Sequence, residues 1–478
     1  MKKRFLIIAW LLLLIPLVSF GETITVAPGK GMLTETLGNC ADGDVILLED
    51  GIFTDPEESF PLTVNRSVII RAAEGAHPVI DAPVMKAAFR IEADGVTLEG
   101  INIRFRRTGI YAIGNELTMK CCRIALADEA WRVSSCGIWC GGIRRMTLKE
   151  CAFTGCGVAL AGPPLSERSE TLPKLTGLFE VGEDPEYFTS HTIENCTVNG
   201  KPLFYAAGLP SVDAPQDAGE IIICGCDEAS VRGADVSDCS MGMILAFNDR
   251  ITVENSRADR CGVFGIYAAK CGGGEITGCS AERTNHAIDI RADRNITLKN
   301  CSAVSCEQGM FFSSVTDSVM LDCNVTDTRQ GYFMAAGNGN TMTGCVAAGC
   351  ENGVHLEKET DVLMTSCTVE KCTVCGVRLD RTSLTMIHNT MKENWTAMIA
   401  YGNTTGAIAD NLFTGNENCS MFLRNIGFCR LIGNRIEKSG LYSVIAIGTV
   451  KESIWTANKT DIPANFSEVT DGFALTDP

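Results

Sequence analysis

The sequence predicts an all-β fold, a single-stranded right-handed parallel β-helix of about 14 coils with an N-terminal cap. Two ladders of residues carry this prediction. One ladder repeats every 22 residues and consists of Cys279, Cys301, Cys323, Cys345 and Cys367, continued by Asn389 and Asn411. The other repeats every 22 or 23 residues and consists of Gly242, Gly265, Ala287, Gly309, Gly331, Gly353 and Gly376. Short apolar segments such as RITV and SVML lie between them, so one period holds three strands and their turns.

A period of this length excludes most other repeat architectures. Twenty-two residues are too few for a strand, a crossover helix and a return strand. They suit one triangular coil whose apolar face is buried when coils stack about 4.8 Å apart. The general handedness of parallel crossovers predicts a right-handed coil. Period-two alternation, with Gly, Asn, Asp or Ser at each turn, argues against helices.

The chain begins with a segment typical of a cleavable signal peptide. Residues 1–21 contain Lys2, Lys3 and Arg4, then an apolar run and small residues before a plausible cleavage site. A membrane anchor would need a longer apolar span. We therefore expect a secreted, periplasmic or cell-surface protein whose mature form has no membrane span.

The rest of the chain is expected to form one long domain. Residues 22–94 are predicted to form the N-terminal cap and the first coils, with an amphipathic stretch near Leu33 to Leu37. Residues 95–450 are predicted to form the regular β-helix, interrupted by an inserted loop over 162–194, and residues 451–478 the C-terminal cap or tail. Loops that leave a solenoid often lie beside its functional groove, although this one could equally be a neutral decoration.

The charge balance argues against nucleic acid and anionic lipid as partners. The whole chain carries a net charge of −17, and removal of the three basic residues of the leader leaves 38 basic against 58 acidic residues. Nucleic acid and anionic lipid surfaces require the opposite sign. We expect no nucleic-acid partner.

The 24 cysteines leave three interpretations open. Most occupy repeat positions, which favours buried thiols that act as small hydrophobic residues in successive coils. Neighbouring coils are also close enough for some disulfide bonds. A thiolate metal site would need several converging cysteines, and the tight pairs Cys136/Cys140, Cys224/Cys226 and Cys372/Cys375 are weak signals for it.

The chain resembles two groups of known proteins. GDVILLEDGIF followed by SFPLTVNRSVIIRA looks like the start of many secreted right-handed β-helix proteins of the pectate-lyase-like superfamily. The segment NGKPLFY at Asn199–Tyr205, with Gly219, Ile221–Ile223 and Cys226, is similar to the NosD family of periplasmic copper-binding β-helix proteins. That resemblance implies the same fold and a role in copper-site maturation, but it brings no catalytic residue. Copper and calcium are the metals left open, and no cofactor is assigned.

Outward side chains of the glycine-led strands are the candidate site. Because side chains alternate along a strand, the residue after each core position points outward. The predicted row consists of Trp139, Tyr267, Asp289, Phe311, Phe333, His355 and Arg378, with Arg291, Glu357 and Asp380 two places further along their strands. Aromatic rings stack on pyranose faces, and charged groups hold hydroxyl or uronate groups. Trp139, Tyr267, Asp289, Arg291, Phe311 and Phe333 are therefore the predicted substrate-binding residues.

Catalysis on this row is a further hypothesis. A uronate lyase needs a group that neutralises the carboxylate, a base and an acid, roles open to His355, Glu357, Arg378 and Asp380, or to Lys358. A glycosidase needs two carboxylates at a set separation. The same charges would also suit an ordinary solvated surface.

Three functions therefore stay open. The first is an exported protein that binds, or also modifies, a polysaccharide or cell-surface glycan along its outward strand face, as a polysaccharide lyase or glycosidase if it is an enzyme. The second is a NosD-like periplasmic accessory protein in copper-site maturation. The third is a structural surface protein without catalytic activity.

Overall fold

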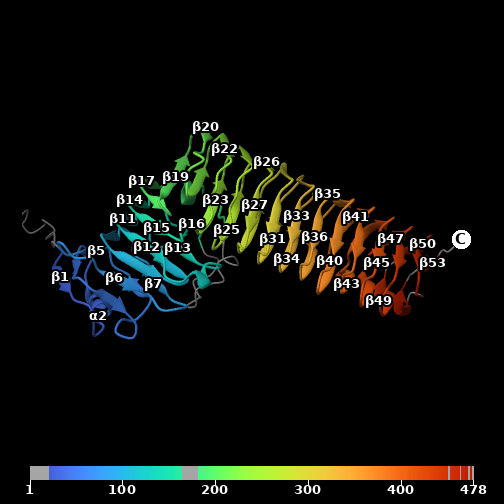
Figure 1. Ribbon diagram of the computed structural model, residues 1–478, viewed down its shortest axis with the longest axis horizontal. Coiled ribbons are helices and arrows are strands. Elements are labelled where there is room, and N and C mark those ends of the chain that lie inside the picture. Colours follow the sequence, from blue (N-terminus) through green and yellow to red (C-terminus); the bar gives the residue numbers. More distant parts are fainter. Residues whose placement is uncertain (1–20, 164–180, 451–452, 463–464, 472–473, 476–478) are drawn as a thin grey trace, which may run out of the picture.

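The computed structural model shows a parallel β-solenoid and confirms the predicted fold class (Figure 1). It describes residues 21–163, 181–450, 453–462, 465–471 and 474–475. The proposed signal peptide and most of the inserted loop lie outside these residues. The described coils make about 19 turns, so the predicted number of about 14 is wrong. The strands of the N-terminal coils recur at irregular spacings, as Thr97, Thr118 and Thr147 show, so no fixed period gives the number of these coils.

The N-terminal segment, residues 21–198, has three parallel sheets. Sheet A contains β1 (Thr23–Val26), β2 (Val45–Leu48), β5 (Ile69–Ala72), β8 (Thr97–Glu99), β11 (Thr118–Lys120), β14 (Thr147–Lys149) and β17 (Thr192–Glu194). Sheet B contains β3 (Ile52–Thr54), β6 (Val79–Asp81), β9 (Asn102–Phe105), β12 (Arg123–Leu126), β15 (Ala152–Thr154) and β18 (Thr197–Val198). Sheet C contains β4 (Leu62–Val64), β7 (Ala87–Ile91), β10 (Thr108–Ala112), β13 (Cys136–Gly141) and β16 (Val158–Ala161).

The C-terminal segment, from residue 201 onward, has three further sheets. Sheet D contains β19 (Lys201–Ala207), β21 (Glu220–Cys224), β23 (Met241–Ala246), β25 (Phe264–Ala269), β28 (His286–Arg291), β31 (Gln308–Ser313), β34 (Gln330–Ala335), β37 (Asn352–Glu357), β40 (Cys375–Asp380), β43 (Thr396–Tyr401), β46 (Cys419–Ile426), β49 (Tyr442–Val450) and β52 (Asn465–Asp471). Sheet E contains β20 (Ser211–Asp213), β22 (Glu228–Arg232), β24 (Arg250–Glu254), β26 (Gly274–Thr277), β29 (Ile296–Lys299), β32 (Val319–Leu321), β35 (Thr341–Thr343), β38 (Val362–Thr365), β41 (Ser383–Ile387), β44 (Thr405–Ala409), β47 (Cys429–Ile432), β50 (Ile454–Thr456) and β53 (Ala474–Leu475). Sheet F contains β27 (Ser280–Glu282), β30 (Ser302–Val304), β33 (Asn324–Thr326), β36 (Val346–Ala348), β39 (Thr368–Glu370), β42 (Thr390–Lys392), β45 (Leu412–Thr414), β48 (Arg435–Glu437) and β51 (Lys459–Thr460).

Helices are rare and sit at the irregular places. Helix α2 (Met32–Asn39) buries Leu33 and Leu37 against the first coils, in the stretch expected to be amphipathic. This contact covers apolar side chains that the first coils would otherwise expose. The single-turn helices η1 (Glu129–Trp131) and α3 (Glu186–Thr189) lie in connections between strands.

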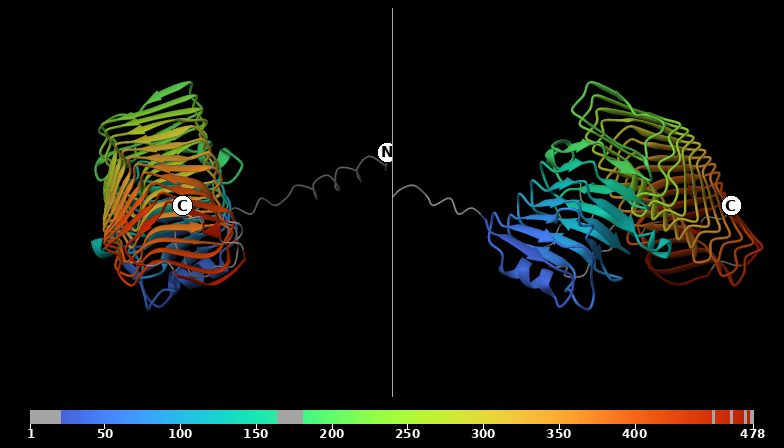
Figure 2. Two further views of the ribbon diagram at one scale, coloured as in Figure 1. Left: turned by 90° about the vertical axis from the view of Figure 1, so that its right-hand side faces the viewer. Right: turned by 60° about the vertical axis from the view of Figure 1, so that its left-hand side comes forward.

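The two segments meet at a joint where the strand direction reverses. β18 and β19 form an antiparallel pair, Thr197 with Pro202 and Val198 with Lys201, and β19 then becomes the first strand of sheet D. The residues from Lys201 onward in the NGKPLFY segment are therefore part of a strand of the solenoid. Figure 2 shows that the coils before and after this reversal stack along different directions.

Buried polar contacts hold the joint together. The main-chain N–H of Val158 in β16 donates to the carboxyl group of Glu220 in β21. The Ser240 hydroxyl accepts N–H groups of Gly137 at 3.0 Å and Gly157 at 2.8 Å. Glu220 and Ser240 therefore satisfy the open edge of sheet C in place of a further strand.

The cysteine ladder is a single file of buried thiols. No disulfide bond joins any of the 24 cysteines, and all except Cys121 are buried, which confirms the interpretation as small core residues. The Sγ atom of Cys301, for example, lies 3.2 Å from the carbonyl oxygen of Ile276 in the preceding coil. In the last coils asparagine replaces cysteine: Asn389 Oδ1 accepts the N–H of Cys367, and Asn411 Oδ1 accepts the N–H of Asn389.

The glycine ladder marks a close approach between coils. A Cβ atom on Gly309 would lie 2.4 Å from the carbonyl oxygen of Gly331, and one on Gly331 would lie 2.3 Å from that of Gly353. Contacts this short force the backbone apart. Glycine therefore lets the coil turn sharply into each strand of sheet D.

Candidate functional site

The outer face of sheet D carries one continuous row of side chains. Strand pairing places Phe311, Phe333, His355, Arg378, Ile399 and Phe422 in register on successive coils. We call this set the outward strip. Its members are half-buried or exposed, whereas their neighbours Met310 and Phe312 are buried in the core. The predicted alternation between core and surface is confirmed for these strands.

The rings of the outward strip contact one another along the solenoid. Phe311 and Phe333 stack with centroids 5.0 Å apart and planes 6° apart. The His355 ring lies edge-on to Phe333 at 4.8 Å. Stacking of this kind fixes ring orientation and presents a flat apolar surface along the coils.

Buried surroundings keep the His355 imidazole neutral. Burial, with the nearby Arg378 guanidinium, lowers the pKa of His355 to about 4. Its Nε2 atom is buried and has no hydrogen-bond partner among the described residues. At neutral pH this ring can accept a proton or donate one hydrogen bond, but it contributes no charge to the strip.

The two candidate carboxylates lie side by side and are engaged by basic residues. Glu357 and Asp380 are paired across β37 and β40. Arg381 reaches both, at 3.5 Å from Glu357 and 2.8 Å from Asp380, and Lys358 lies 3.3 Å from Glu357. Asp380 is also buried. The structure thus brings the four predicted catalytic residues, His355, Glu357, Arg378 and Asp380, onto adjacent coils, but its carboxylates are ion-paired.

A pocket of about 390 Å³ lies at the C-terminal end of the strip. Ile399, Tyr401, Gly402, Phe422, Arg424 and Asn425 line it. Arg378 borders this region, because its Nε donates to the Tyr401 hydroxyl at 2.9 Å and its guanidinium lies over the Tyr401 ring. The exposed guanidinium groups of Arg378 and Arg424 give the strip a basic end.

Sequence analysis did not identify Tyr401, Phe422 or Arg424. The glycine ladder gives way to Ala397 and Ser420 in these coils, so the pattern that marked the outward position stops. The 22-residue spacing from Arg378, extended through Asn389 and Asn411, was the signal that could have found them.

The other end of the predicted row is buried. Trp139 is 2% exposed, and Tyr267 and Asp289 are fully buried, so their predicted exposure is wrong. Trp139 belongs to sheet C and not to sheet D, because the joint separates their coils. Alternation distinguishes the outside of a strand from its inside, but it does not show what covers the outside.

Asp289 is the centre of a buried charge cluster. Its carboxylate accepts hydrogen bonds from Arg291 Nε at 2.6 Å and contacts His286 Nδ1 at 2.7 Å. Burial by itself would raise the pKa of Asp289, but the Arg291 guanidinium and His286 hold it below its usual value. Arg291 also lies over the Phe264 and Phe311 rings. The cluster therefore adjoins the strip at the end nearer the joint.

Comparisons with known families agree with this architecture. The family model "Periplasmic copper-binding protein (NosD)" matches residues 304–458, and the model "Right handed beta helix region" matches residues 186–316. The chain is a NosD-like right-handed β-helix protein. The NosD match of this β-helix starts after the NGKPLFY segment, which lies within the second model. A search of curated proteins gives no match.

Solved structures share the fold of this NosD-like protein only distantly. The mannuronan C-5 epimerase AlgE6 A-module of Azotobacter vinelandii is 13% identical, with 91% of this chain and 94% of that chain covered and a TM-score of 0.31. The periplasmic alginate epimerase AlgG is 10% identical over 91% and 85% of the two chains, with a TM-score of 0.30. Tailspike protein 3 of bacteriophage CBA120 is 9% identical over 94% and 59%, with a TM-score of 0.27. At these values the structures bear on neither activity nor ligand.

A copper or calcium ion would need several converging donor side chains among the described residues. Among them, no group of three or more His, Cys, Asp or Glu side chains is placed to hold a metal ion. The Sγ atoms of Cys239 and Cys261 lie 3.7 Å apart, and both thiols are fully buried. Burial raises the pKa of the Cys239 thiol, whereas hydrogen bonds from neighbouring thiols lower the pKa of Cys301 and of Cys345.

Proposed function

We propose that this protein binds a polysaccharide chain along the outward strip of sheet D. The observation that carries the proposal is the unbroken row of Phe311, Phe333 and His355 rings, which leads to the pocket beside Tyr401 and Phe422. Aromatic faces of this kind stack on pyranose rings, and a row along the coils suits a linear polymer.

The charges of the strip favour acidic sugars as ligands. Arg378 and Arg424 are exposed at its C-terminal end, while Glu357 and Asp380 are already held by Arg381. A guanidinium group binds a carboxylate through two parallel hydrogen bonds. Uronate units beside Arg378 and Arg424 are therefore the proposed partners.

Binding fits the site better than glycosidase chemistry does. A glycosidase needs one protonated and one free carboxyl group on opposite sides of the scissile bond. Glu357 and Asp380 instead share Arg381 on the same face. Neutral His355 keeps the base role of a uronate lyase open, with Arg378 to neutralise the uronate carboxylate.

A glycan screen tests the proposal. Residues 22–478 are screened against an array that includes uronic-acid polymers, together with a Phe311→Ala/Phe333→Ala variant. We expect binding by the parent protein and at least a tenfold loss in the variant. Trp395→Ala is the control, because Trp395 is a 49% exposed aromatic residue outside the strip. If the parent protein forms an unsaturated product and His355→Ala does not, the protein is also a lyase. If the double variant still binds the glycan, the strip is not the binding site.

The copper-linked function is a second candidate, favoured by the NosD family match over residues 304–458. It requires the reduced protein to retain stoichiometric Cu(I) against a competing chelator. Cys121→Ala identifies any contribution of the exposed cysteine. Complete loss of copper to the chelator would remove this candidate, and failure of both tests would leave the structural surface role. Each of these functions places the protein outside the cytoplasm, as the leader at residues 1–21 predicts.

A further inference from the structure

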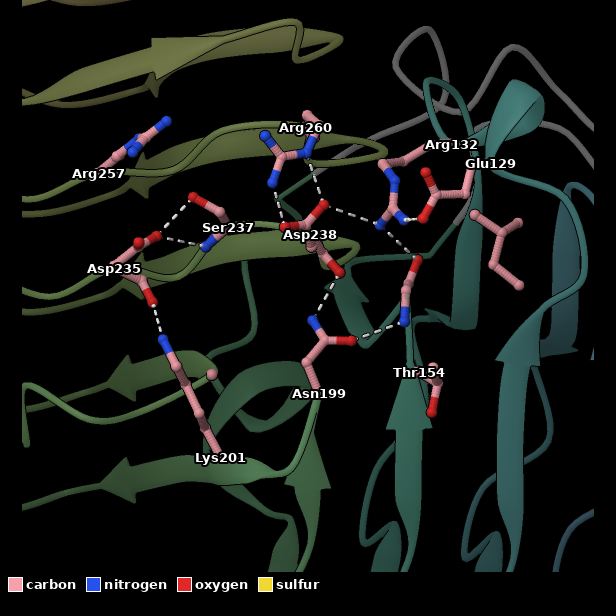
Figure 3. A pocket seen from close by; sticks show the side chains of 13 residues that line it. Glu129, Arg132, Thr154, Asn199, Lys201, Asp235, Ser237, Asp238, Arg257 and Arg260 are labelled. Atoms are coloured by element: carbon pink, nitrogen blue, oxygen red, sulfur yellow. Dashed lines mark hydrogen bonds and ion pairs between the residues drawn. The ribbon is translucent and has the colours of Figure 1, made fainter.

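A second pocket, of about 570 Å³, opens at the joint between the two segments (Figure 3). We call it the joint pocket. Its volume lies within the range of small-molecule sites, about 300–1,000 Å³. Sheet B contributes Leu126 and Thr154 to its lining and β19 contributes Lys201, whereas no residue of the outward strip lines it. Its polar lining residues are Glu129, Arg132, Thr154, Asn199, Lys201, Asp235, Ser237, Asp238, Arg257 and Arg260.

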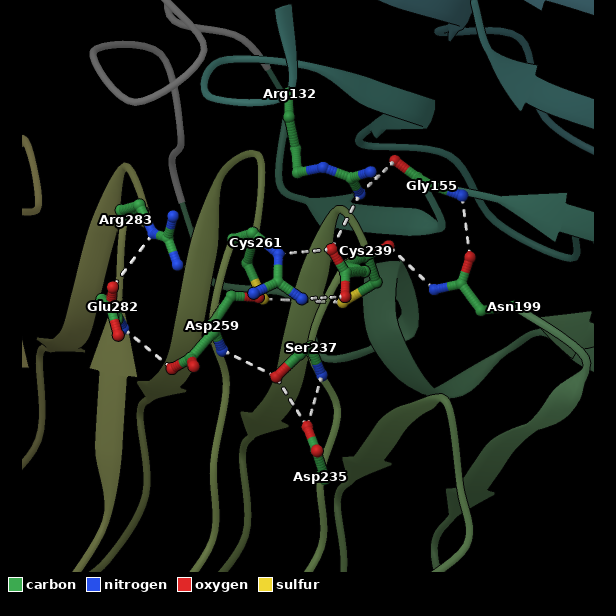
Figure 4. A network of polar contacts seen from close by, with 12 residues as sticks. Arg132, Gly155, Asn199, Asp235, Ser237, Cys239, Asp259, Cys261, Glu282 and Arg283 are labelled. Carbon is green, nitrogen blue, oxygen red and sulfur yellow. Dashed lines mark hydrogen bonds and ion pairs between the residues drawn. The ribbon is translucent and has the colours of Figure 1, made fainter. Parts of the chain in front are cut away.

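The reversal of the chain between β18 and β19 builds this pocket. Asn199 occupies the turn with φ 52°. Its Oδ1 accepts the N–H of Gly155 at 2.8 Å, and its Nδ2 donates to the carbonyl oxygen of Asp238 at 2.9 Å (Figure 4). Asn199 thus ties the N-terminal segment to the first coils of the C-terminal segment. The same turn projects Lys201 toward Asp235 (Figure 3).

The carboxylates of the joint pocket already form ion pairs or hydrogen bonds with other residues of the pocket. Asp238 pairs with Arg260 and lies 3.4 Å from Arg132. Asp235 accepts the hydroxyl and the N–H of Ser237. Arg132, whose side chain is 10% exposed, also contacts Glu129 at 2.9 Å. Through these ion pairs Asp238 and Glu129 hold the Arg260 and Arg132 side chains in place.

The basic groups keep unused donors. Lys201 Nζ donates to the carbonyl oxygen of Asp235 at 2.9 Å and contacts no carboxylate among the described residues. Arg260 binds Asp238 through Nε and Nη2, and Arg257 binds Asp259 through the same two atoms. Neither Nη1 has a partner in the described part of the chain. The pocket therefore has more hydrogen-bond donors to offer than acceptors.

We propose that the joint pocket binds a small sugar that carries an oxyanion, either a carboxylate or a phosphate. Four basic and three acidic side chains line it, in a protein whose net charge is −17. The free donors of Lys201, Arg257 and Arg260 would hold the oxyanion, because charge-assisted hydrogen bonds to such groups are the strong ones. Thr154 and Ser237 are placed to contact sugar hydroxyls.

Calorimetric titration of residues 22–478 tests this proposal. The probes are glucuronate, glucose 6-phosphate and inorganic phosphate, with neutral glucose for comparison. We expect one or both acidic sugars to bind and glucose not to bind. Lys201→Gln/Arg257→Gln should weaken that binding at least tenfold. The preference between glucuronate and glucose 6-phosphate identifies the oxyanion.

The controls separate this site from the outward strip and from misfolding. Lys299→Gln removes an exposed lysine of β29 far from the joint and should leave binding unchanged. Phe311→Ala/Phe333→Ala should also leave it unchanged, so the two sites can fail independently. Lys201→Gln alone serves if the double variant melts at a lower temperature. Absence of binding by every acidic probe, or equal binding by the Lys201 variants, would overturn the proposal.

Discussion

The pKa of His355 in the outward strip depends on the residues around it. Burial against Phe333 and the charge of Arg378 lower its pKa to about 4. An unfolded histidine has a pKa of about 6.5, so acidification protonates the unfolded state first. The contribution of this residue to stability is therefore complete above about pH 6.5 and is lost as the pH falls toward 4.

We expect His355→Gln to reduce the loss of stability on acidification from pH 7 to pH 5. Melting temperatures of parent and variant at both pH values measure it. His191 is buried with a pKa also lowered to about 4, so some acid sensitivity should remain. His77→Gln, which changes an exposed histidine, is the control. An unchanged pH dependence in His355→Gln would contradict the assigned environment.

For single residues, the sequence predicted to which side of its strand a side chain points better than it predicted whether that side chain is exposed. Phe311, Phe333 and His355 point outward as alternation predicts, but Tyr267 and Asp289 are covered. The alternation of side chains follows from the backbone of a strand, whereas the burial of an outward side chain depends on segments that are distant in sequence. The expected use of asparagine at turns is also found: Asn295, Asn300 and Asn403 have positive φ.

At the scale of single elements, the glycine ladder sets how closely coils approach at the entrance to sheet D. Gly331 has no room for a side chain, because its Cβ would lie 2.3 Å from the Gly353 carbonyl oxygen. The neighbouring contact is backbone and cannot rotate away. Overpacking of this kind costs about 1–3 kcal/mol.

Gly331→Ala should therefore lower the urea midpoint of unfolding by an amount equivalent to about 1–3 kcal/mol. Gly38→Ala is the matched control, since a Cβ on this residue of α2 would meet nothing within 4 Å. Alanine in a helix is expected to be neutral or stabilising there. Equal effects of the two substitutions would show that close approach does not explain the ladder.

The three-strand coil was predictable because its ladders recur at a nearly constant spacing. The position of cysteine is kept even where asparagine replaces it, as the N–H of Cys367 donates to Asn389 Oδ1. In the N-terminal segment the turns vary in length, so no ladder forms and the number of coils was underestimated. Coils of unequal length can still bury a continuous core, but they leave no fixed spacing of residues in the sequence.

At the scale of the whole molecule, Glu220 is the buried acid at the joint of the two segments. Burial raises its pKa well above its usual value, so it stays protonated in the folded protein at pH values where the unfolded chain has ionised it. Its contribution to stability is complete at acidic pH and is lost as the pH rises through its folded-state pKa.

Glu220→Gln should therefore gain stability relative to the parent as the pH is raised from 5 to 8. Melting temperatures across this range measure the difference. Asp293 and Glu359 have pKa values raised by burial too, so a smaller slope should remain in the variant. Glu437→Gln, which changes a surface residue of β48, is the comparison. A parallel pH profile for parent and Glu220→Gln would show that this carboxyl group is not neutral in the fold.

The joint itself was not predictable, because the segment that makes it resembles a strand of the regular repeat. Lys201–Ala207 pairs in parallel with β21 as a strand of sheet D does, and only its antiparallel pairing with β18 marks the change. Pairing direction is a long-range property. The joint pocket and its basic residues were missed for the same reason.

The regular stacking of sheet D gives the outward strip a fixed length. Phe311 and Phe422 are five coils apart, and coils rise about 4.8 Å each, so the strip is about 24 Å long. Beyond Phe311 toward the joint the row is buried at Asp289 and Tyr267. If the strip binds a polysaccharide as proposed, affinity should rise with each sugar added to an oligosaccharide and level off once the oligosaccharide spans the distance from Phe311 to Phe422.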